Sequence, residues 1–116
     1  MEASPKTSLS RADFLAAAGS GQKAINPAFL VQFRSTGLGM VRFGLTVTKK
    51  HGNAVIRNKI KRRLREAVRV TLRETALPNG DYVVIARNEA LTAEFNTLLT
   101  FTRQAFSRIH KPKPLV

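Results

Sequence analysis

The stretch GNAVIRNKIKRRLRE, residues 52–66, combines a helical apolar pattern with a dense positive charge. Eight of its fifteen residues are Arg, Lys or Asn, and four aliphatic side chains are spaced among them. At about 100° of rotation per residue, the pattern predicts an amphipathic helix over residues 54–73. We expect its apolar stripe to pack on a sheet, with Ile56, Ile60, Leu64, Ala67, Val68 and Thr71 as its members.

The opposite side of this helix carries charge of one sign. Residues 49–73 hold ten Lys or Arg and a single acid, Glu66. A merely solvated helix face usually mixes Glu with Lys, because each like-charged pair one turn apart costs about 0.2–0.5 kcal/mol. We therefore interpret this face as a phosphate-binding surface. On the wheel, Asn58, Arg62, Arg65, Arg69 and Arg73 lie opposite the stripe, Lys59 and Lys61 flank them, and Arg57 and Arg63 lie nearer the apolar edges.

The whole chain supports a polyanionic partner. It has 116 residues, which indicates one domain, and 20 Lys or Arg against 7 Asp or Glu give a net charge of +13. With no Cys, the chain has no disulfide and no thiolate. No apolar run reaches the roughly 18 residues of a membrane span and the first ten residues do not resemble a signal peptide, so we expect a cytoplasmic protein.

The rest of the chain predicts a single sheet packed with helices. Gly and Pro mark the turns, notably TGLG at 36–39 and LPNGD at 77–81. The two alternating runs on either side of TGLG predict an antiparallel hairpin, and splitting one run would add a third strand. The predicted elements are, in order, a helix over 10–19 with Ser10 as N-cap, strands over 29–35 and 40–48, the basic helix, a strand over 81–87 and a helix over 92–109. This order predicts an α+β fold, with one domain at 10–109 and loose tails at 1–9 and 110–116.

Candidate catalytic or metal-binding groups are absent from the sequence. His51 and His110 are the only histidines, and the seven acids are scattered without a paired arrangement. No metal-ligand cluster, phosphate loop or nucleophile motif appears. We therefore predict no catalytic residue, no metal site and no cofactor bound by the protein alone.

The residues FGLTVTKKHGNAVIRNKIKRRLREAVR, 43–69, resemble the protein component of bacterial ribonuclease P. That family carries the signature KK-x-G-N-A-V-x-R-N-x-x-K-R-x-x-R. The signature is matched here by Lys49, Lys50, Gly52, Asn53, Ala54, Val55, Arg57, Asn58, Lys61, Arg62 and Arg65. Weaker similarity reaches RADF at 11–14 and DYVVIAR at 81–87. The resemblance implies a four-stranded sheet with three helices, ordered α-β-β-β-α-β-α, and a left-handed β-α-β crossover around the basic helix, against the usual right-handed rule.

The resemblance also implies a role inside a ribonucleoprotein. There a large RNA, with its own Mg²⁺ ions, removes the 5′ leader from precursor transfer RNA. The basic helix and the loop before it would contact this RNA subunit through Lys49, Lys50, Arg57, Asn58, Lys59, Lys61, Arg62, Arg65 and Arg69. A cleft between that helix and the sheet would hold the single-stranded leader, next to Phe14, Gln32, Thr46 and Thr48. The family often has aromatic residues where this chain has Ala18 and Gln32, and Phe14 could equally be a core residue.

Two other classes of protein remain open at this stage. One is a structural RNA-binding protein of the ribosomal kind, with no role in catalysis. The other is a basic amphipathic binder of membranes or DNA. We rank the second class last, because the apolar side of the basic helix carries no aromatic residue.

Overall fold

Four strands form one mixed sheet in the order β1-β2-β4-β3. The computed structural model describes residues 9–110. The strands are β1 (Gln22–Ile25), β2 (Phe29–Arg34), β3 (Val41–Thr46) and β4 (Gly80–Ala86). β2 pairs antiparallel with both β1 and β4, whereas β3 and β4 are parallel. The predicted tails lie outside the described residues, apart from Leu9 and His110.

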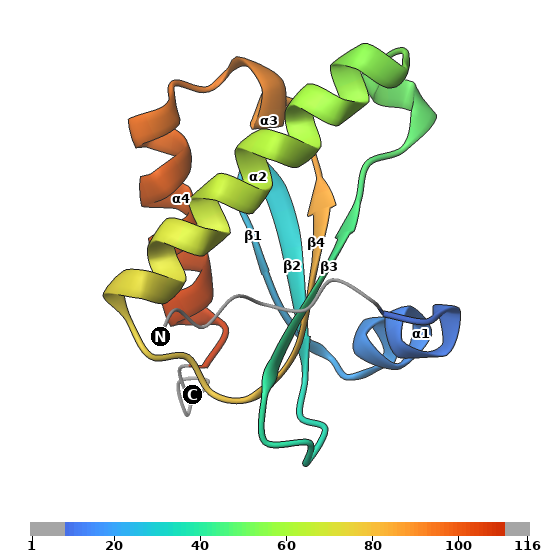
Figure 1. Ribbon diagram of the computed structural model, residues 1–116, viewed down its shortest axis with the longest axis vertical. Coiled ribbons are helices and arrows are strands. Elements are labelled where there is room, and N and C mark those ends of the chain that lie inside the picture. The colour runs from blue at the N-terminus through green and yellow to red at the C-terminus, as the bar shows by residue number, and fades with distance from the viewer. Residues whose placement is uncertain (1–8, 111–116) are drawn as a thin grey trace, which may run out of the picture.

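The helices cover the two faces of this sheet unequally. α2 (Ala54–Glu74) and α4 (Phe95–Arg108) lie together on one face, and α1 (Arg11–Gly19) lies on the other (Figure 1). These are the three helices that we predicted. A single extra turn, α3 (Glu89–Thr92), precedes α4, and a short 3-10 turn, η1 (Lys49–His51), precedes α2. The α+β class and the predicted order of the main elements are confirmed.

The chain passes from β3 through α2 to β4, and these two strands are parallel neighbours. In the upper half of Figure 1 both strands run upward, α2 lies in front of the sheet, and β4 lies to the left of β3. A crossover in front of the sheet that moves to the left is left-handed. The crossover implied by the resemblance is therefore confirmed.

The predicted hairpin between the runs at 29–35 and 40–48 is wrong. β2 and β3 are not partners, because β4 lies between them and pairs with both. The actual hairpin joins β1 to β2, where the side chain of Asn26 accepts hydrogen bonds from the backbone of Ala28 at 2.8 Å and Phe29 at 2.9 Å. The alternation of apolar and polar residues did not predict β1, because only one of its four residues, Ala24, is buried.

The core lies between the sheet and the helices α2 and α4. The alternating strand positions Phe29, Val31 and Phe33 are all buried, as their spacing predicted. The buried residues of α2 are Ile60, Leu64, Ala67, Val68 and Thr71, so the predicted apolar stripe is confirmed, with Ile56 half-buried at its end. This packing fixes which side of α2 faces outward.

His110 packs on the core, although we placed it in the C-terminal tail. Its ring centroid lies 4.6 Å from that of Phe33, and its Nε2 lies 2.7 Å from the hydroxyl of Tyr82. Burial lowers the pKa of His110 below its usual value and raises the pKa of Tyr82. Both effects favour the neutral forms of the two rings.

Candidate RNA-binding surface

The N-terminus of α2 is a positively charged end with a fixed geometry. Asn53 caps the helix by accepting a hydrogen bond from the backbone of Ile56 at 3.0 Å, and the first turn contains no acid. Gly52 has a φ of 131°, a conformation that favours glycine. Nε2 of His51 lies 3.1 Å from the backbone oxygen of Ala86, which ties η1 to the end of β4. The loop with Lys49 and Lys50 is thus held beside the helix start.

Seven cations in this region form what we call the basic surface. They are Lys49, Lys50, Arg57, Lys59, Lys61, Arg62 and Arg65. Within residues 9–110, none of them has an acidic side chain within ion-pair distance. Asn58, which lies among them, is exposed. Seven cations without a protein counter-ion repel one another, and a polyanion would remove this cost.

Two other arginines of α2 have partners within the protein. Arg63 donates from Nε to the backbone oxygen of Ala90 at 3.0 Å and from Nη2 to that of Ala93. Arg69, which we predicted to bind RNA, forms an ion pair with Glu66 at 3.1 Å. The unpaired charge therefore ends at Arg65, and the C-terminal third of α2 has mixed charge.

Arg57 differs from the other members of the basic surface. Its side chain is half-buried, and its Nε is a buried donor without a hydrogen-bond partner among the described residues. A buried donor that remains unpaired typically costs about 1–3 kcal/mol. A ligand with oxygen acceptors, such as a phosphate, would supply the missing partner.

The predicted position of the leader cleft needs correction. We expected a cleft between the basic helix and the sheet, but buried side chains such as Ile60 and Leu64 fill that space. Gln32 and Thr46, two of the predicted leader contacts, lie on the other face of the sheet, because they alternate with the core positions. We call this surface the open face; it consists of Leu30, Gln32, Gly44, Thr46, Val83 and Ile85.

Phe14 closes the end of the open face that lies beneath α1. It rests on Gly44: a Cβ added there would lie 2.9 Å from Cζ of Phe14 and 2.6 Å from Cδ1 of Leu9. Phe14 is half-buried and is not part of the buried core, so it is available at the surface. Leu9 and Gly44 were missed by sequence reasoning, because alternation assigns a face but not which side chain covers it.

The other end of the open face reaches the basic surface. A depression of about 270 Å³ there is lined by Leu30, Lys50, Ile85, Ala86, Arg87 and Asn88. Thr48, the remaining predicted leader contact, is exposed and starts the η1 turn that carries Lys50. Ala18 is exposed on α1. The open face and the basic surface therefore meet at Lys50, and together they form one continuous surface.

The described part of the chain offers little for catalysis by side chains. Across residues 9–110, no three His, Asp or Glu side chains are grouped to hold a metal ion. Both histidines have structural contacts, with Ala86 and Tyr82. Over the same residues, no helix is long and apolar enough to cross a membrane.

Comparison with known proteins gives a consistent result. The family model described as Ribonuclease P matches residues 6–110. The ribonuclease P protein component of Bartonella quintana is 47% identical over 110 residues, covering 89% of this chain and 79% of that protein. For the component of Ruegeria pomeroyi, the identity is 42%, over 90% and 86% of the two chains.

Solved structures agree with the sequence relatives. The ribonuclease P protein of Staphylococcus aureus superimposes with a TM-score of 0.77 at 30% identity, over 90% of this chain and 94% of that one. The ribonuclease P protein of Thermotoga maritima gives a TM-score of 0.76 at 33% identity, over 91% and 99%.

Proposed function

The chain belongs to the ribonuclease P protein family, and from this membership we infer that it is the protein component of ribonuclease P. In this role it binds the RNA subunit of the enzyme and assists the endonucleolytic removal of the 5′ leader from precursor transfer RNA. Its partners are the catalytic RNA and the precursor transfer RNA. We also propose that it works in the bacterial cytoplasm, where such precursors are made.

The basic surface is the observation that supports RNA binding most directly. Among residues 9–110, seven cations without ion-pair partners occupy the loop before α2 and the part of α2 up to Arg65, whereas the two acids of α2, Glu66 and Glu74, both come after it. Each Lys or Arg that meets a phosphate releases a counter-ion, which favours binding. We assign contact with the RNA subunit to these seven cations and Asn58. Arg69 is left out of the assignment, because Glu66 already balances its charge.

The open face is our candidate for holding the single-stranded leader. Phe14 provides one aromatic ring, and Gln32, Thr46 and Thr48 provide polar groups along the track. Base stacking on one aromatic ring is worth about 1–3 kcal/mol. With Ala18 and Gln32 where the family often has aromatics, hydrogen bonds take a larger share of leader binding in this proposal.

We assign the chemistry itself to the RNA subunit and its Mg²⁺ ions. The support is that residues 9–110 contain no grouped metal ligands and that both histidines are held in structural contacts. A two-metal mechanism of phosphodiester hydrolysis requires positioned ions more than side-chain acids or bases. The protein alone is then inactive, and its positive charge reduces the repulsion between the RNA subunit and its RNA substrate.

Reconstitution tests this proposal. The purified, RNA-free protein should leave precursor transfer RNA intact. Added to a bacterial ribonuclease P RNA, it should increase correct 5′ processing, most strongly at low Mg²⁺, where repulsion between the two RNAs is greatest. Specific cleavage by the protein alone, or no stimulation at any Mg²⁺ concentration, would refute the proposal.

A structural RNA-binding role without catalysis is the second candidate, and the basic surface alone would also suit it. The leader site proposed on the open face distinguishes the two candidate functions, because a purely structural protein would not bind precursor transfer RNA more tightly than mature transfer RNA. The membrane-binding alternative loses its physical basis, since the apolar stripe of α2 is buried against the sheet.

A further inference from the structure

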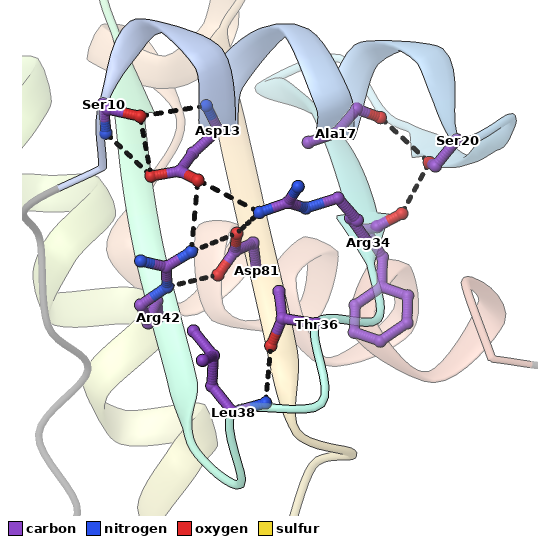
Figure 2. Close-up of polar contacts among 10 residues, drawn as sticks. Ser10, Asp13, Ala17, Ser20, Arg34, Thr36, Leu38, Arg42 and Asp81 are labelled. Carbon is purple, nitrogen blue, oxygen red and sulfur yellow. Dashed lines mark hydrogen bonds and ion pairs between the residues drawn. The ribbon is translucent and has the colours of Figure 1, made fainter.

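Four charged side chains form a network between α1 and the sheet. Asp81 on β4 lies at its centre with a fully buried side chain, flanked by Arg34 on β2 and Arg42 on β3. Both arginines also reach Asp13 on α1 (Figure 2). The two acids balance the two arginines, so the network has no net charge. The network joins all three of these strands to α1.

The contacts of Asp81 are short. Arg42 donates from Nε to Oδ1 at 2.7 Å and from Nη2 to Oδ2 at 2.8 Å, in the two-pronged geometry that suits guanidinium and carboxylate. Arg34 donates from Nη2 to Oδ2 of the same carboxylate at 2.8 Å. Asp81 thereby fixes the position of both arginines on the sheet.

The two oxygens of Asp13 have separate partners. Oδ2 accepts from the backbone nitrogen of Ser10 at 2.9 Å and from its hydroxyl at 3.0 Å, completing the capping box of α1. Oδ1 faces the two arginines, 3.1 Å from Nη2 of Arg34 and 3.3 Å from Nη2 of Arg42. One oxygen stabilises the helix, and the other attaches the helix to the sheet.

Phe14 directly follows Asp13, and its ring rests on Gly44 at the end of the open face. The C-terminal end of α1 is held separately, by the buried Ala17 and by the hydroxyl of Ser20, which donates to the backbone oxygen of Phe33 at 2.6 Å; Asp13 holds the N-terminal turn that carries Phe14. Displacement of this turn of α1 would therefore move the Phe14 ring away from Gly44 and the open face. We propose that Asp13 is a positioning residue for leader binding, acting through Arg34, Arg42 and Asp81 to hold Phe14 in place. This inference rests on the proposed function of the open face.

Asp13→Asn isolates the ion pairs from the helix cap. Asparagine keeps one oxygen to accept from Ser10, while its amide donors face the two arginines and cannot pair with them. Glu74→Gln is a matched control, because it also removes one negative charge and an ion pair, the 2.7 Å contact with Arg103 on the opposite side of the sheet. The readout is the ratio of precursor to mature transfer RNA affinity in the reconstituted holoenzyme.

The expected result is a non-additive pair of mutations. Phe14→Ala should lower the ratio by about 5- to 140-fold, the equivalent of one lost stacking contact. Asp13→Asn should cause most of that loss, and should change the ratio less than about twofold when Phe14 is already Ala. Glu74→Gln should leave the ratio unchanged.

Several outcomes would overturn the inference, and they can be told apart. If Phe14→Ala lowers the ratio but Asp13→Asn does not, Asp13 is no positioning residue and the leader site stands. If the two losses add, Asp13 acts independently of Phe14. An increase with Asp13→Asn would mean that freed arginines bind the leader themselves. If Phe14→Ala has no effect, the leader site itself fails, and the inference with it.

Discussion

Arg63 points its guanidinium at the protein: its Nε donates to the backbone oxygen of Ala90 at 3.0 Å, and Nη2 reaches Ala93. It is a basic residue of the same helix as Arg62 and Arg65, yet it holds the segment around α3 against α2. Basic residues on one helix thus have different surroundings, because Arg62 and Arg65 have no ion-pair partner among residues 9–110.

Arg63→Ala should reduce stability without changing the electrostatics of RNA binding. Hydrogen bonds from a charged donor are worth about 1.5–3 kcal/mol, so we expect a loss of that order in the free energy of unfolding. The slope of log affinity against log salt for the RNA subunit should stay the same. Urea denaturation and salt titrations measure the two quantities; a reduced slope with normal stability would assign Arg63 to RNA contact.

Gly44→Ala should weaken leader discrimination. The added methyl group would lie 2.6 Å from Leu9 and 2.9 Å from Phe14, so at least one of these side chains must move. We expect the difference in binding free energy between precursor and mature transfer RNA to shrink by at most the value of one stacking contact, about 1–3 kcal/mol. Gly19→Ala is the control, because a Cβ there has no neighbour within 4 Å. An unchanged ratio for Gly44→Ala would mean that the ring position is unimportant.

Asp81→Asn should be strongly destabilising. The carboxylate is fully buried and neutralises two arginines, and removing one partner of a buried ion pair typically costs about 3–5 kcal/mol. The midpoint of urea unfolding should shift accordingly. Glu74→Gln, which removes an exposed ion pair, should shift it far less. Similar shifts for the two variants would show that burial of Asp81 does not matter.

Much of the fold follows from periodicity in the sequence. The spacing of Ile60, Leu64 and Val68 predicted the buried side of α2, and alternation predicted the buried positions of β2. Alternation assigns a face but not a neighbour. Alternation therefore led us to predict a hairpin of β2 with β3. In the structure β4, which starts some forty residues after the start of β3, lies between them.

The candidate site could be predicted only in part. The excess of positive charge identified α2 as a helix with cations that lack acidic partners within residues 9–110. Charge alone could not show that Arg63 contacts the protein while Arg62 does not, because that difference lies in the contacts with α3. The run at 81–87 predicted a buried strand, and nothing local indicated that Asp81 would be buried with two arginines from other strands. Such contacts depend on sheet order, which the local pattern does not determine.

His110 should make stability depend on pH near neutrality. Burial lowers its pKa in the folded protein, so below about pH 6.5 the unfolded chain binds the proton more readily. Stability should therefore fall as pH decreases from 7.5 through 6.5 towards the folded pKa, and level off below that value. The lowered pKa values of Asp13 and Glu74 act only at more acidic pH.

Comparison with His110→Gln isolates this effect. The variant should have a flatter profile of unfolding free energy between pH 7.5 and 5.5 than the wild-type protein. Identical profiles would mean that His110 titrates normally, despite its contacts with Phe33 and Tyr82.

The salt dependence of RNA-subunit binding tests the central claim most directly. Two double variants remove the same charge: Arg62→Ala with Arg65→Ala takes unpaired cations from the basic surface, and Arg69→Ala with Arg103→Ala takes cations that pair with Glu66 and Glu74. We predict that the first pair flattens the slope of log affinity against log salt by about two and that the second leaves it nearly unchanged. Equal slopes for the two double variants would contradict the account, because the protein would then bind RNA through its net charge and not through the basic surface.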